Sequence, residues 1–216
     1  EAYLGKPIVR LSDDRGFDHW LHVYGDYLPS PQMRWCTRQL KIRPFEKYVG
    51  DDKVISYVGI RADENRAGYI STKPNITPRY PFKEDGIRKD DVIRILENAG
   101  LGLPDYYSWR TRSGCYFCFF QRKSEWLGLK EHHPERFEEA KKYEKIDETT
   151  GKRFTWSQSE SLTELEQPAR ADEIRRKHLK VLNTEQAARP DRPLFEILTD
   201  VNDAEDEDEP CDICHL

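Results

Sequence analysis

The chain has 216 residues, of which 37% are hydrophobic and 35% are charged, a composition typical of one globular domain with extensions. No run approaches the roughly 18 apolar residues that a membrane-spanning helix needs, and the first residues do not form a signal peptide. Five cysteines are few for a disulfide scaffold, and in a reducing compartment clustered cysteines more often bind metal or do redox chemistry. We therefore expect a cytoplasmic protein with no membrane partner.

The net charge of −5 is unevenly distributed. Seven acidic residues lie between Asp200 and Glu209, so the remainder of the chain is slightly basic. An acidic run without apolar residues predicts a solvated, disordered tail, and it argues neither for nor against a nucleic-acid partner. Met33 is the only methionine, so we expect a segment upstream of Glu1.

The first half of the chain predicts a parallel α/β sheet. The apolar runs at residues 5–11 and 52–60 are typical of buried strands. Between them, residues 37–49 have helical apolar spacing, with Thr37 as a candidate N-cap and Pro44 inside the run. The order strand, helix, strand indicates parallel pairing.

Three further helices are predicted. In residues 88–104, acidic residues open a helix whose apolar face contains Val92, Ile95 and Leu96, and Gly100 is its expected C-cap. The other two helices are expected at residues 134–147, after Pro134, and at 171–189. We place the end of the compact fold near residue 165.

The sequence "GCYFC" contains Cys115 and Cys118 at the spacing that lets two thiolates meet one metal or cluster. A redox pair and two inert buried cysteines are the alternatives. Cys36 is the only other cysteine before the tail, which adds Cys211 and Cys214 at the same spacing. Three thiolates fit a closed zinc site poorly, because such a site needs four ligands, and they would suit an iron–sulfur cluster with one open iron.

Basic residues suggest anion binding at two places. Arg61 and Arg66 follow the second predicted strand, at the sheet edge where ligands bind in open α/β folds, although a solvated, ion-paired loop is the alternative. Four basic residues flank the cysteine pair, where they would stabilise a negative cluster or hold an anionic substrate. They are Arg110, Arg112, Arg122 and Lys123. His132 and His133 are expected at the surface, at the start of a helix.

The order of four motifs resembles the phosphoadenosine phosphosulfate (PAPS) reductase family over residues 1–145. The motifs are "RWCTRQLKIRPF", "VISYVGIRADENR", "YPF" before "DDVIRIL", and "LPDYYSWRTRSGCYFC". Within the family, the chain looks most like reductase-like proteins of phages and bacterial defence systems, including DNA phosphorothioation sulfurtransferases. The resemblance implies an adenine nucleotide α-hydrolase-like, Rossmann-like fold.

The family's glycine- and serine-rich PP-loop is not found in this sequence, so the resemblance implies that the N-terminal nucleotide-binding half is missing. Residues 1–110 would be the distal part of the α/β domain. Residues 111–165 would be a helical cluster-binding segment, and residues 166–216 a helical, then acidic and disordered tail.

The resemblance also implies site residues by matching position. Lys41, Arg61 and Arg66 would line the nucleotide site, for ATP or PAPS. The cluster ligands of a [4Fe-4S] centre would be Cys36, Cys115 and Cys118. The sequence departs from the pattern of the cluster-type reductases at two places. Trp35 and Cys36 stand where those reductases carry paired cysteines. The chain ends in "CDICHL", where they have Glu-Cys-Gly-x-His.

The leading functional hypothesis is ATP-dependent, iron–sulfur-assisted sulfur transfer, with a nucleic acid as a candidate acceptor and a sulfur-donor protein as a candidate partner. The second is reduction of PAPS or a related sulfonucleotide, with Cys211 or Cys214 as the nucleophile. The third, from another class, is a non-catalytic zinc-binding subunit of a defence complex.

Overall fold

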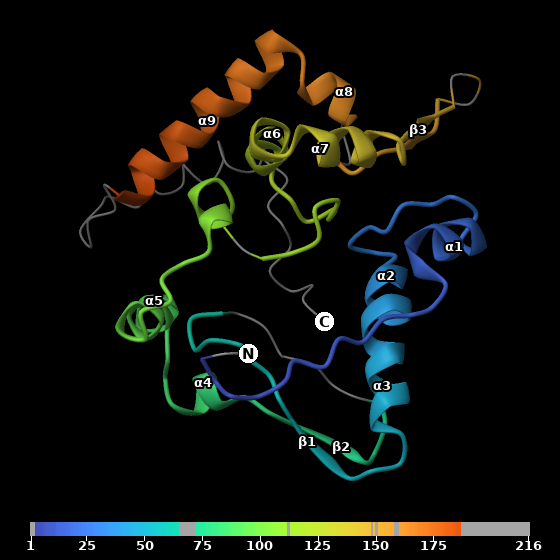
Figure 1. The fold of residues 1–216 in the computed structure, drawn as a ribbon. Coiled ribbons are helices and arrows are strands. Elements are labelled where there is room, and N and C mark those ends of the chain that lie inside the picture. The colour runs from blue at the N-terminus through green and yellow to red at the C-terminus, as the bar shows by residue number, and fades with distance from the viewer. Residues whose placement is uncertain are drawn as a thin grey trace, which may run out of the picture. The chain divides into compact units, whose positions relative to one another are not determined.

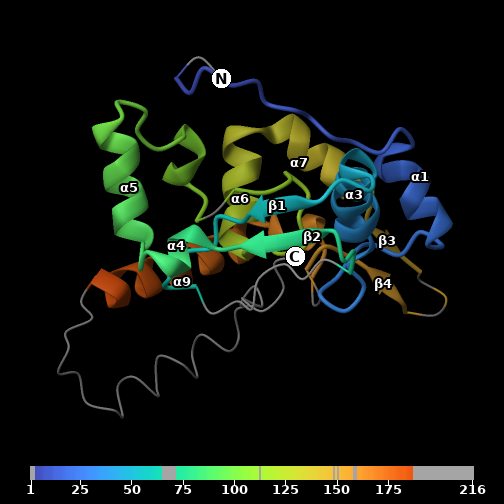
Figure 2. The same cartoon turned by 90° about the horizontal axis from the view of Figure 1, so that it is seen from below.

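The computed structural model describes residues 3–64, 72–111, 113–147, 149, 151–157 and 160–186. The chain forms two compact units that meet in the sequence between Gly102 and Leu103. Helices and strands are mixed, and the strands form two small two-stranded sheets (Figures 1 and 2). Among the described residues, no helix has the length and apolar character needed to cross a membrane.

The first unit contains short helices and one parallel strand pair. In chain order its elements are α1 (Gly16–Val23), α2 (Trp35–Thr37), the π-helix η1 (Arg38–Ile42), α3 (Arg43–Val49), β1 (Val54–Tyr57), β2 (Ile76–Arg79), α4 (Pro81–Glu84) and α5 (Lys89–Asn98). β1 and β2 are parallel, with Val54 opposite Ile76 and Tyr57 opposite Arg79. The parallel α/β character that the sequence predicts is present in this pair.

One predicted strand is wrong. Residues 5–11 contain no strand and run as an extended blue trace in Figure 2, with Ile8 65% exposed and Val9 55% exposed. A parallel strand forms only where a neighbouring strand supplies its hydrogen-bond partners. Among the described residues β1 pairs with β2 alone, so this apolar run has not joined the sheet.

The predicted helix at 37–49 is present but starts earlier, at Trp35. Thr37 is not its cap, because the Thr37 N–H already donates to the Arg34 carbonyl at 3.1 Å. The π-helix η1 ends two residues before Pro44, and the N–H of the following residue, Arg43, reaches back five residues to the Arg38 carbonyl. Proline has no N–H for an ordinary helical bond, and the wider turn accommodates the chain at this point.

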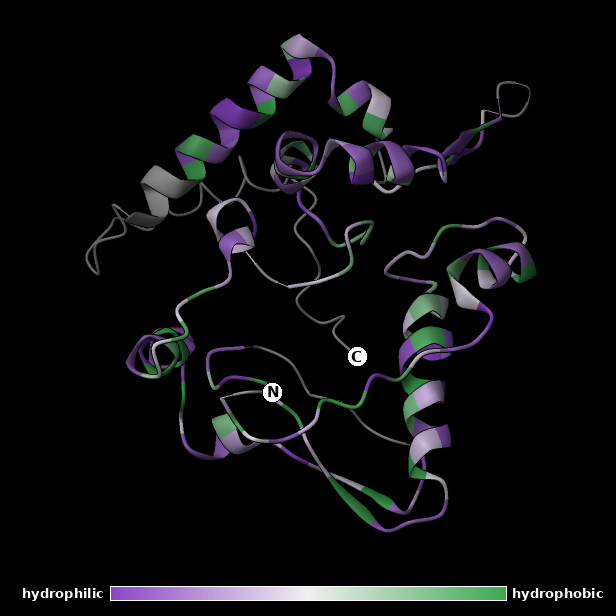
Figure 3. Ribbon diagram, viewed as in Figure 1, coloured by the Kyte–Doolittle hydropathy of each residue, from purple (hydrophilic) through white to green (hydrophobic). Residues whose placement is uncertain are grey.

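α5 confirms the helix predicted within 88–104, but it has no buried residue. Gly100, with a φ of +70°, follows it in the left-handed region that glycine tolerates. Ile95 on its apolar face is 50% exposed. Green, hydrophobic residues of α5 and of β1 are visible in Figure 3.

The second unit is helical and has a dense core. Its elements are the 3₁₀-helix η2 (Asp105–Ser108), α6 (Lys123–His132), α7 (Pro134–Lys141), the antiparallel pair β3 (Lys145–Ile146) and β4 (Arg153–Phe154), α8 (Leu162–Leu165) and α9 (Pro168–Gln186). α9 packs against α6 and α8, and its Ala171 and Ile174 are buried. The compact part therefore continues beyond residue 165, where the sequence analysis placed its end.

The predicted helix at 134–147 is shorter than expected, because α7 ends at Lys141 and β3 begins at Lys145. α7 does begin at Pro134, as predicted. The predicted helix at 171–189 corresponds to α9, and its residues 187–189 lie outside the described part of the chain.

Candidate functional site

The cysteine pair lies in a turn of the second unit, directly before α6. Tyr116 and Phe117 form the turn between Cys115, which is exposed, and Cys118, which is half-buried. A second turn follows at once, in which the Gln121 N–H donates to the Cys118 carbonyl at 3.0 Å. The sequence prediction of a tight turn that carries two thiols therefore fits the backbone found here.

Buried side chains hold three successive carbonyls of this turn. Arg110 donates from Nη1 to the Gly114 carbonyl at 3.2 Å and from Nη2 to the Cys115 carbonyl at 3.1 Å. Gln121 Nε2 donates to the Tyr116 carbonyl at 2.7 Å. Arg110 and Gln121 are both buried. Because its carbonyls are fixed from the protein side, the turn presents the cysteines in a defined conformation.

Gly114 lets the guanidinium approach the backbone. A Cβ at this position would lie 3.2 Å from Arg110 Nη2, which is closer than ordinary van der Waals contact. A larger residue at 114 would push the guanidinium from the carbonyls that it holds.

Glu125 fastens the segment before the cysteines to the start of α6. Its Oε1 accepts from the Thr111 N–H at 2.8 Å and the Thr111 hydroxyl at 2.7 Å. Its Oε2 accepts from the Arg122 N–H at 3.1 Å. The side chain is 2% exposed, and these three donors provide the hydrogen bonds that a buried carboxylate requires.

Aromatic packing anchors the middle of the turn. The Phe117 ring lies 5.7 Å from the ring of Tyr143 and 5.6 Å from that of Trp156, centroid to centroid. Trp156 in turn lies 6.1 Å from Trp126 and donates from Nε1 to the Ala140 carbonyl at 2.9 Å. Phe117, one of the two residues between the cysteines, is half-buried and packs against the buried Trp156 of the second unit's core.

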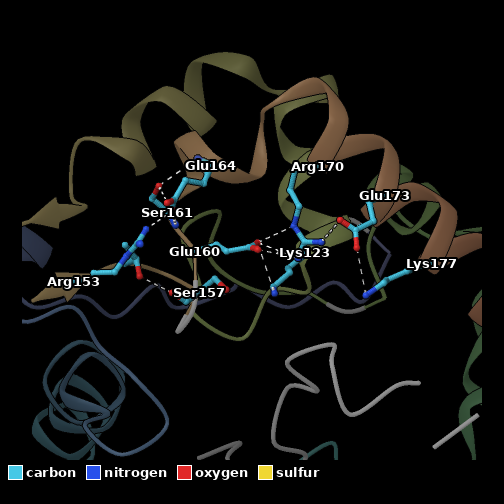
Figure 4. Close-up of polar contacts among 10 residues, drawn as sticks. Lys123, Arg153, Ser157, Glu160, Ser161, Glu164, Arg170, Glu173 and Lys177 are labelled. Carbon is cyan, nitrogen blue, oxygen red and sulfur yellow. Dashed lines mark hydrogen bonds and ion pairs between the residues drawn. The ribbon is translucent and has the colours of Figure 1, made fainter. Parts of the chain in front are cut away.

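An ion-pair network supports the start of α6 (Figure 4). Glu160 lies between Lys123 Nζ, at 3.7 Å, and Arg170 Nη2, at 2.9 Å. Arg170 also pairs with Glu173 at 2.6 Å, and Glu173 with Lys177 at 3.6 Å. Lys123, which the sequence analysis offered as a cation for a cluster or substrate, therefore already pairs with a carboxylate of its own chain.

The two described nucleotide-site candidates lie in the first unit. Lys41 is exposed on η1. Arg61 pairs through Nε with Asp63 at 3.0 Å and through Nη1 with Glu64 at 3.3 Å, and the hydrogen bond from Arg61 is the main cause that lowers the pKa of Asp63. The loop thus has the ion pairs expected of a solvated, ion-paired loop, which is the alternative to an anion site. A phosphate would compete with two carboxylates for Arg61. Arg66 lies outside the described residues.

Cys36 is half-buried in α2, within the first unit. Its neighbour Trp35 stacks on Tyr24, with centroids 5.4 Å apart, and donates to the Tyr27 carbonyl at 3.0 Å. Cys115 and Cys118 belong to the second unit. Within the described part of either unit, no three Cys, His, Asp or Glu side chains form a group that could hold a metal ion. Cys211 and Cys214 lie outside the described residues.

Sequence reasoning missed two residues that shape this site. Gln121 had no recognisable signal, because its partner, the Tyr116 carbonyl, is a backbone group. Glu125 could have been found, because an acidic residue three positions after a helix cap is a known helix-start pattern. His132 and His133 are exposed, as predicted, but they lie at the junction of α6 and α7 rather than only at a helix start.

No family model matches the chain, and no solved structure matches it. It is similar to two uncharacterised proteins of Methanocaldococcus jannaschii. The first is 28% identical over 151 residues, which are 64% of this chain and 30% of the relative. The second is 24% identical over 139 residues, 57% of this chain and 32% of the relative. The chain thus spans about a third of the length of these relatives.

Proposed function

We propose that this chain belongs to a PAPS reductase-like enzyme of nucleotide-dependent sulfur chemistry, with a [4Fe-4S] cluster held by Cys36, Cys115 and Cys118. The observation that carries the proposal is the cysteine turn, whose carbonyls are fixed by buried Arg110 and Gln121. Inert cysteines need no such frame. The parallel pair of β1 and β2 is compatible with an adenine nucleotide α-hydrolase-like fold.

The chemistry of the cysteine turn supports the proposal of an iron–sulfur cluster. Thiolates are the usual ligands of such clusters, and a negative cluster is stabilised by nearby positive charge and hydrogen bonds. The turn offers one exposed and one half-buried cysteine, and the Arg110 guanidinium is bound to the carbonyl of Cys115 itself. Three cysteine ligands would leave one iron of the cluster with an open coordination position. The binding of sulfur there is the chemistry that the cluster would supply.

The overall reaction would use ATP to activate the acceptor. Adenylation of an acceptor oxygen releases pyrophosphate. Attack by sulfur, brought as sulfide by a donor, then forms the bond from acceptor to sulfur and breaks the bond to that oxygen, which leaves with AMP. Lys41, Arg61 and Arg66 would bind the nucleotide phosphates, and Arg61 would exchange its carboxylate partners for phosphate oxygens. A nucleic acid is the proposed acceptor.

Metal analysis tests the proposal. Protein purified without oxygen is expected to contain iron and acid-labile sulfide and to absorb broadly near about 400 nm. Cys115→Ser, Cys118→Ser and Cys36→Ser should each remove most of this absorbance. Cys211→Ser and Cys214→Ser are the matched controls and should retain it. A colourless protein with stoichiometric zinc would contradict the proposal and favour a zinc-binding subunit.

A further inference from the structure

A cavity of about 310 Å³ lies in the second unit beside the cysteine turn. Its lining is mainly aromatic and cationic: Tyr106, Trp109, Arg110, Ser113, Gly114, Tyr116, Leu129, His133 and Arg136. Small-molecule sites occupy roughly 300–1,000 Å³ and combine apolar walls with a few polar groups, so the size and lining suit a small ligand.

Trp109 forms a wall whose orientation is fixed. Its ring stacks on His132 of α6, with centroids 5.5 Å apart and planes 14° apart. It also packs tightly on Gly128 one turn earlier, where an added Cβ would lie 2.8 Å from Trp109 Cε3. Glycine at 128 is therefore required for the ring to lie against α6. A ring held in this way is preorganised to stack with a flat ligand.

Arg110 carries a buried positive charge that no carboxylate compensates within the described part of the chain. The residue is 8% exposed. Its Nη atoms bind two neutral carbonyls, its guanidinium lies 5.8 Å from the centre of the Trp109 ring, and its Nε has no hydrogen-bond partner. Burial of a charge without an opposite charge is costly. An anion in the adjoining cavity would remove that cost.

The other guanidinium of the lining is already compensated. Arg136 pairs with Glu139 at 2.8 Å and lies over the Tyr116 ring at 5.1 Å. Arg110 is therefore the arginine of the cavity whose positive charge is available to an anionic ligand, and Arg136 adds a second polar group to the lining.

We infer that this cavity binds a second nucleotide, distinct from the one proposed for Lys41, Arg61 and Arg66, with its base against Trp109 and Tyr106 and its phosphate beside Arg110. A flat heteroaromatic ring that carries an anion matches both features of the lining, because aromatic side chains stack on any base and guanidinium groups bind phosphate. The choice of a nucleotide among aromatic anions rests on the proposed function. The ligand is either a free nucleotide or a nucleotide within a single strand of nucleic acid.

Calorimetric titration of the full chain tests this inference with AMP, adenosine and inorganic phosphate as probes. AMP should bind more tightly than either of its parts. Trp109→Leu should weaken AMP binding about five- to 150-fold, the loss expected when one base loses its stacking partner. Ser113→Glu adds a negative charge to the cavity at an exposed position and should weaken AMP far more than adenosine. Arg176→Gln, an exposed arginine of α9 outside the cavity, is the matched control and should change nothing.

Two further titrations separate the alternatives. A short single-stranded oligoadenylate that binds more tightly than AMP identifies a nucleic-acid strand as the source of the nucleotide, and equal affinity identifies the free nucleotide. Either result supports the inferred site in the cavity, provided that Trp109→Leu weakens the binding. Absence of AMP and oligoadenylate binding, or binding that neither Trp109→Leu nor Ser113→Glu alters, overturns the inference.

The double variant Cys115→Ser, Cys118→Ser separates the cavity from the cluster. AMP binding that persists in this variant supports the cavity even if the protein proves to contain no iron. AMP binding that disappears with the cysteines would overturn the inference, because the charge of Arg110 would then serve the cysteine pair rather than a ligand of the cavity.

Discussion

The two units bury their apolar side chains to very different degrees. The largest fully buried side chains all belong to the second unit: Trp126, Phe137, Leu129, Leu162, Leu165 and Glu125. In the first unit, β1 exposes Ile55 and Tyr57, at 56% and 69%, and α5 exposes Ile95. Apolar burial is the main source of folding free energy. The cysteine turn and the cavity thus rest on the unit with the most completely buried core, whereas β1 and α5 of the first unit leave large apolar side chains exposed.

Truncation of the core should show this difference most strongly. Phe137 is fully buried, with 0% exposure, and Phe137→Ala should lower the free energy of unfolding of the second unit by about 3–5 kcal/mol through lost burial and the cavity left behind. Ile95→Ala in α5 should cost about 0.5 kcal/mol or less. Amide hydrogen exchange, followed separately for peptides of α5 and α7, measures each unit in the same sample. Equal losses of protection for the two variants would refute the comparison.

Loss of the buried carboxylate should have the next largest effect. Glu125→Gln replaces one acceptor oxygen by an amide N–H₂ that faces donors, and we expect a loss of about 1–3 kcal/mol in the unfolding free energy. The turn should also loosen, so Cys118 should react faster with a thiol reagent. Glu135→Gln is the control, because the Glu135 side chain is 65% exposed. Unchanged stability and unchanged reactivity of Cys118 would show that Glu125 does not hold the turn.

The smallest predicted effects concern the pH dependence of the fold's stability. Burial acts to raise the pKa of Glu166, but hydrogen bonds from Lys141 and Lys130 outweigh it and lower that pKa. A lowered pKa stabilises the fold above the ordinary glutamate pKa of about 4.3, and the stabilisation is lost as the pH falls through the folded value. Glu166→Gln should therefore be less stable than the wild type by up to about 1 kcal/mol near pH 7, and the difference should vanish in acid.

The exposed ion pair of Arg79 and Glu84 in the first unit should contribute less than the partly buried Glu166. The hydrogen bond from Arg79 lowers the pKa of Glu84 to about 2, but the side chains of both residues are exposed, so solvent screens the pair. Glu84→Gln should change the pH dependence of unfolding less than Glu166→Gln does. Unfolding monitored between neutral pH and about pH 3 measures both variants, and a larger effect at Glu84 would reverse the predicted order.

Local patterns predicted the elements that depend on local causes. Acidic first-turn residues and Gly100 define α5, and the β-branched run at 52–60 contains β1. The apolar run at 5–11 has a similar composition but forms no strand, because pairing depends on a partner that the run itself does not encode. The same limit applies to the site: the spacing of Cys115 and Cys118 is visible in the sequence, but the carbonyls held by Arg110 and Gln121 exist only in the folded chain.

A regular helical pattern also fails between residues 35 and 49. The spacing of Leu40, Phe45 and Val49 is typical of one helix face, yet Leu40 and Phe45 are half-buried, whereas Gln39 and Pro44 are buried. Gln39 donates to the Tyr24 hydroxyl at 2.9 Å and accepts from Arg43 at 2.7 Å. The π turn interrupts the 3.6-residue period, so a helical wheel drawn through it assigns the wrong faces.

The π turn also decides where a residue can be removed from this helix. Each residue of an α-helix advances the chain by about 100° around the axis. The π bond from the Arg43 N–H to the Arg38 carbonyl spans one residue more than an ordinary helical bond, so removal of one residue from η1 would restore regular geometry and leave α2 and α3 in nearly the same relative phase. Cys36 and Trp35 would then keep the sides of the helix that they occupy now. Removal of one residue from the regular part of α3 would instead rotate the residues before it by about 100° relative to those after it, so η1 is the place in this helix where a deletion leaves the direction of Cys36 unchanged.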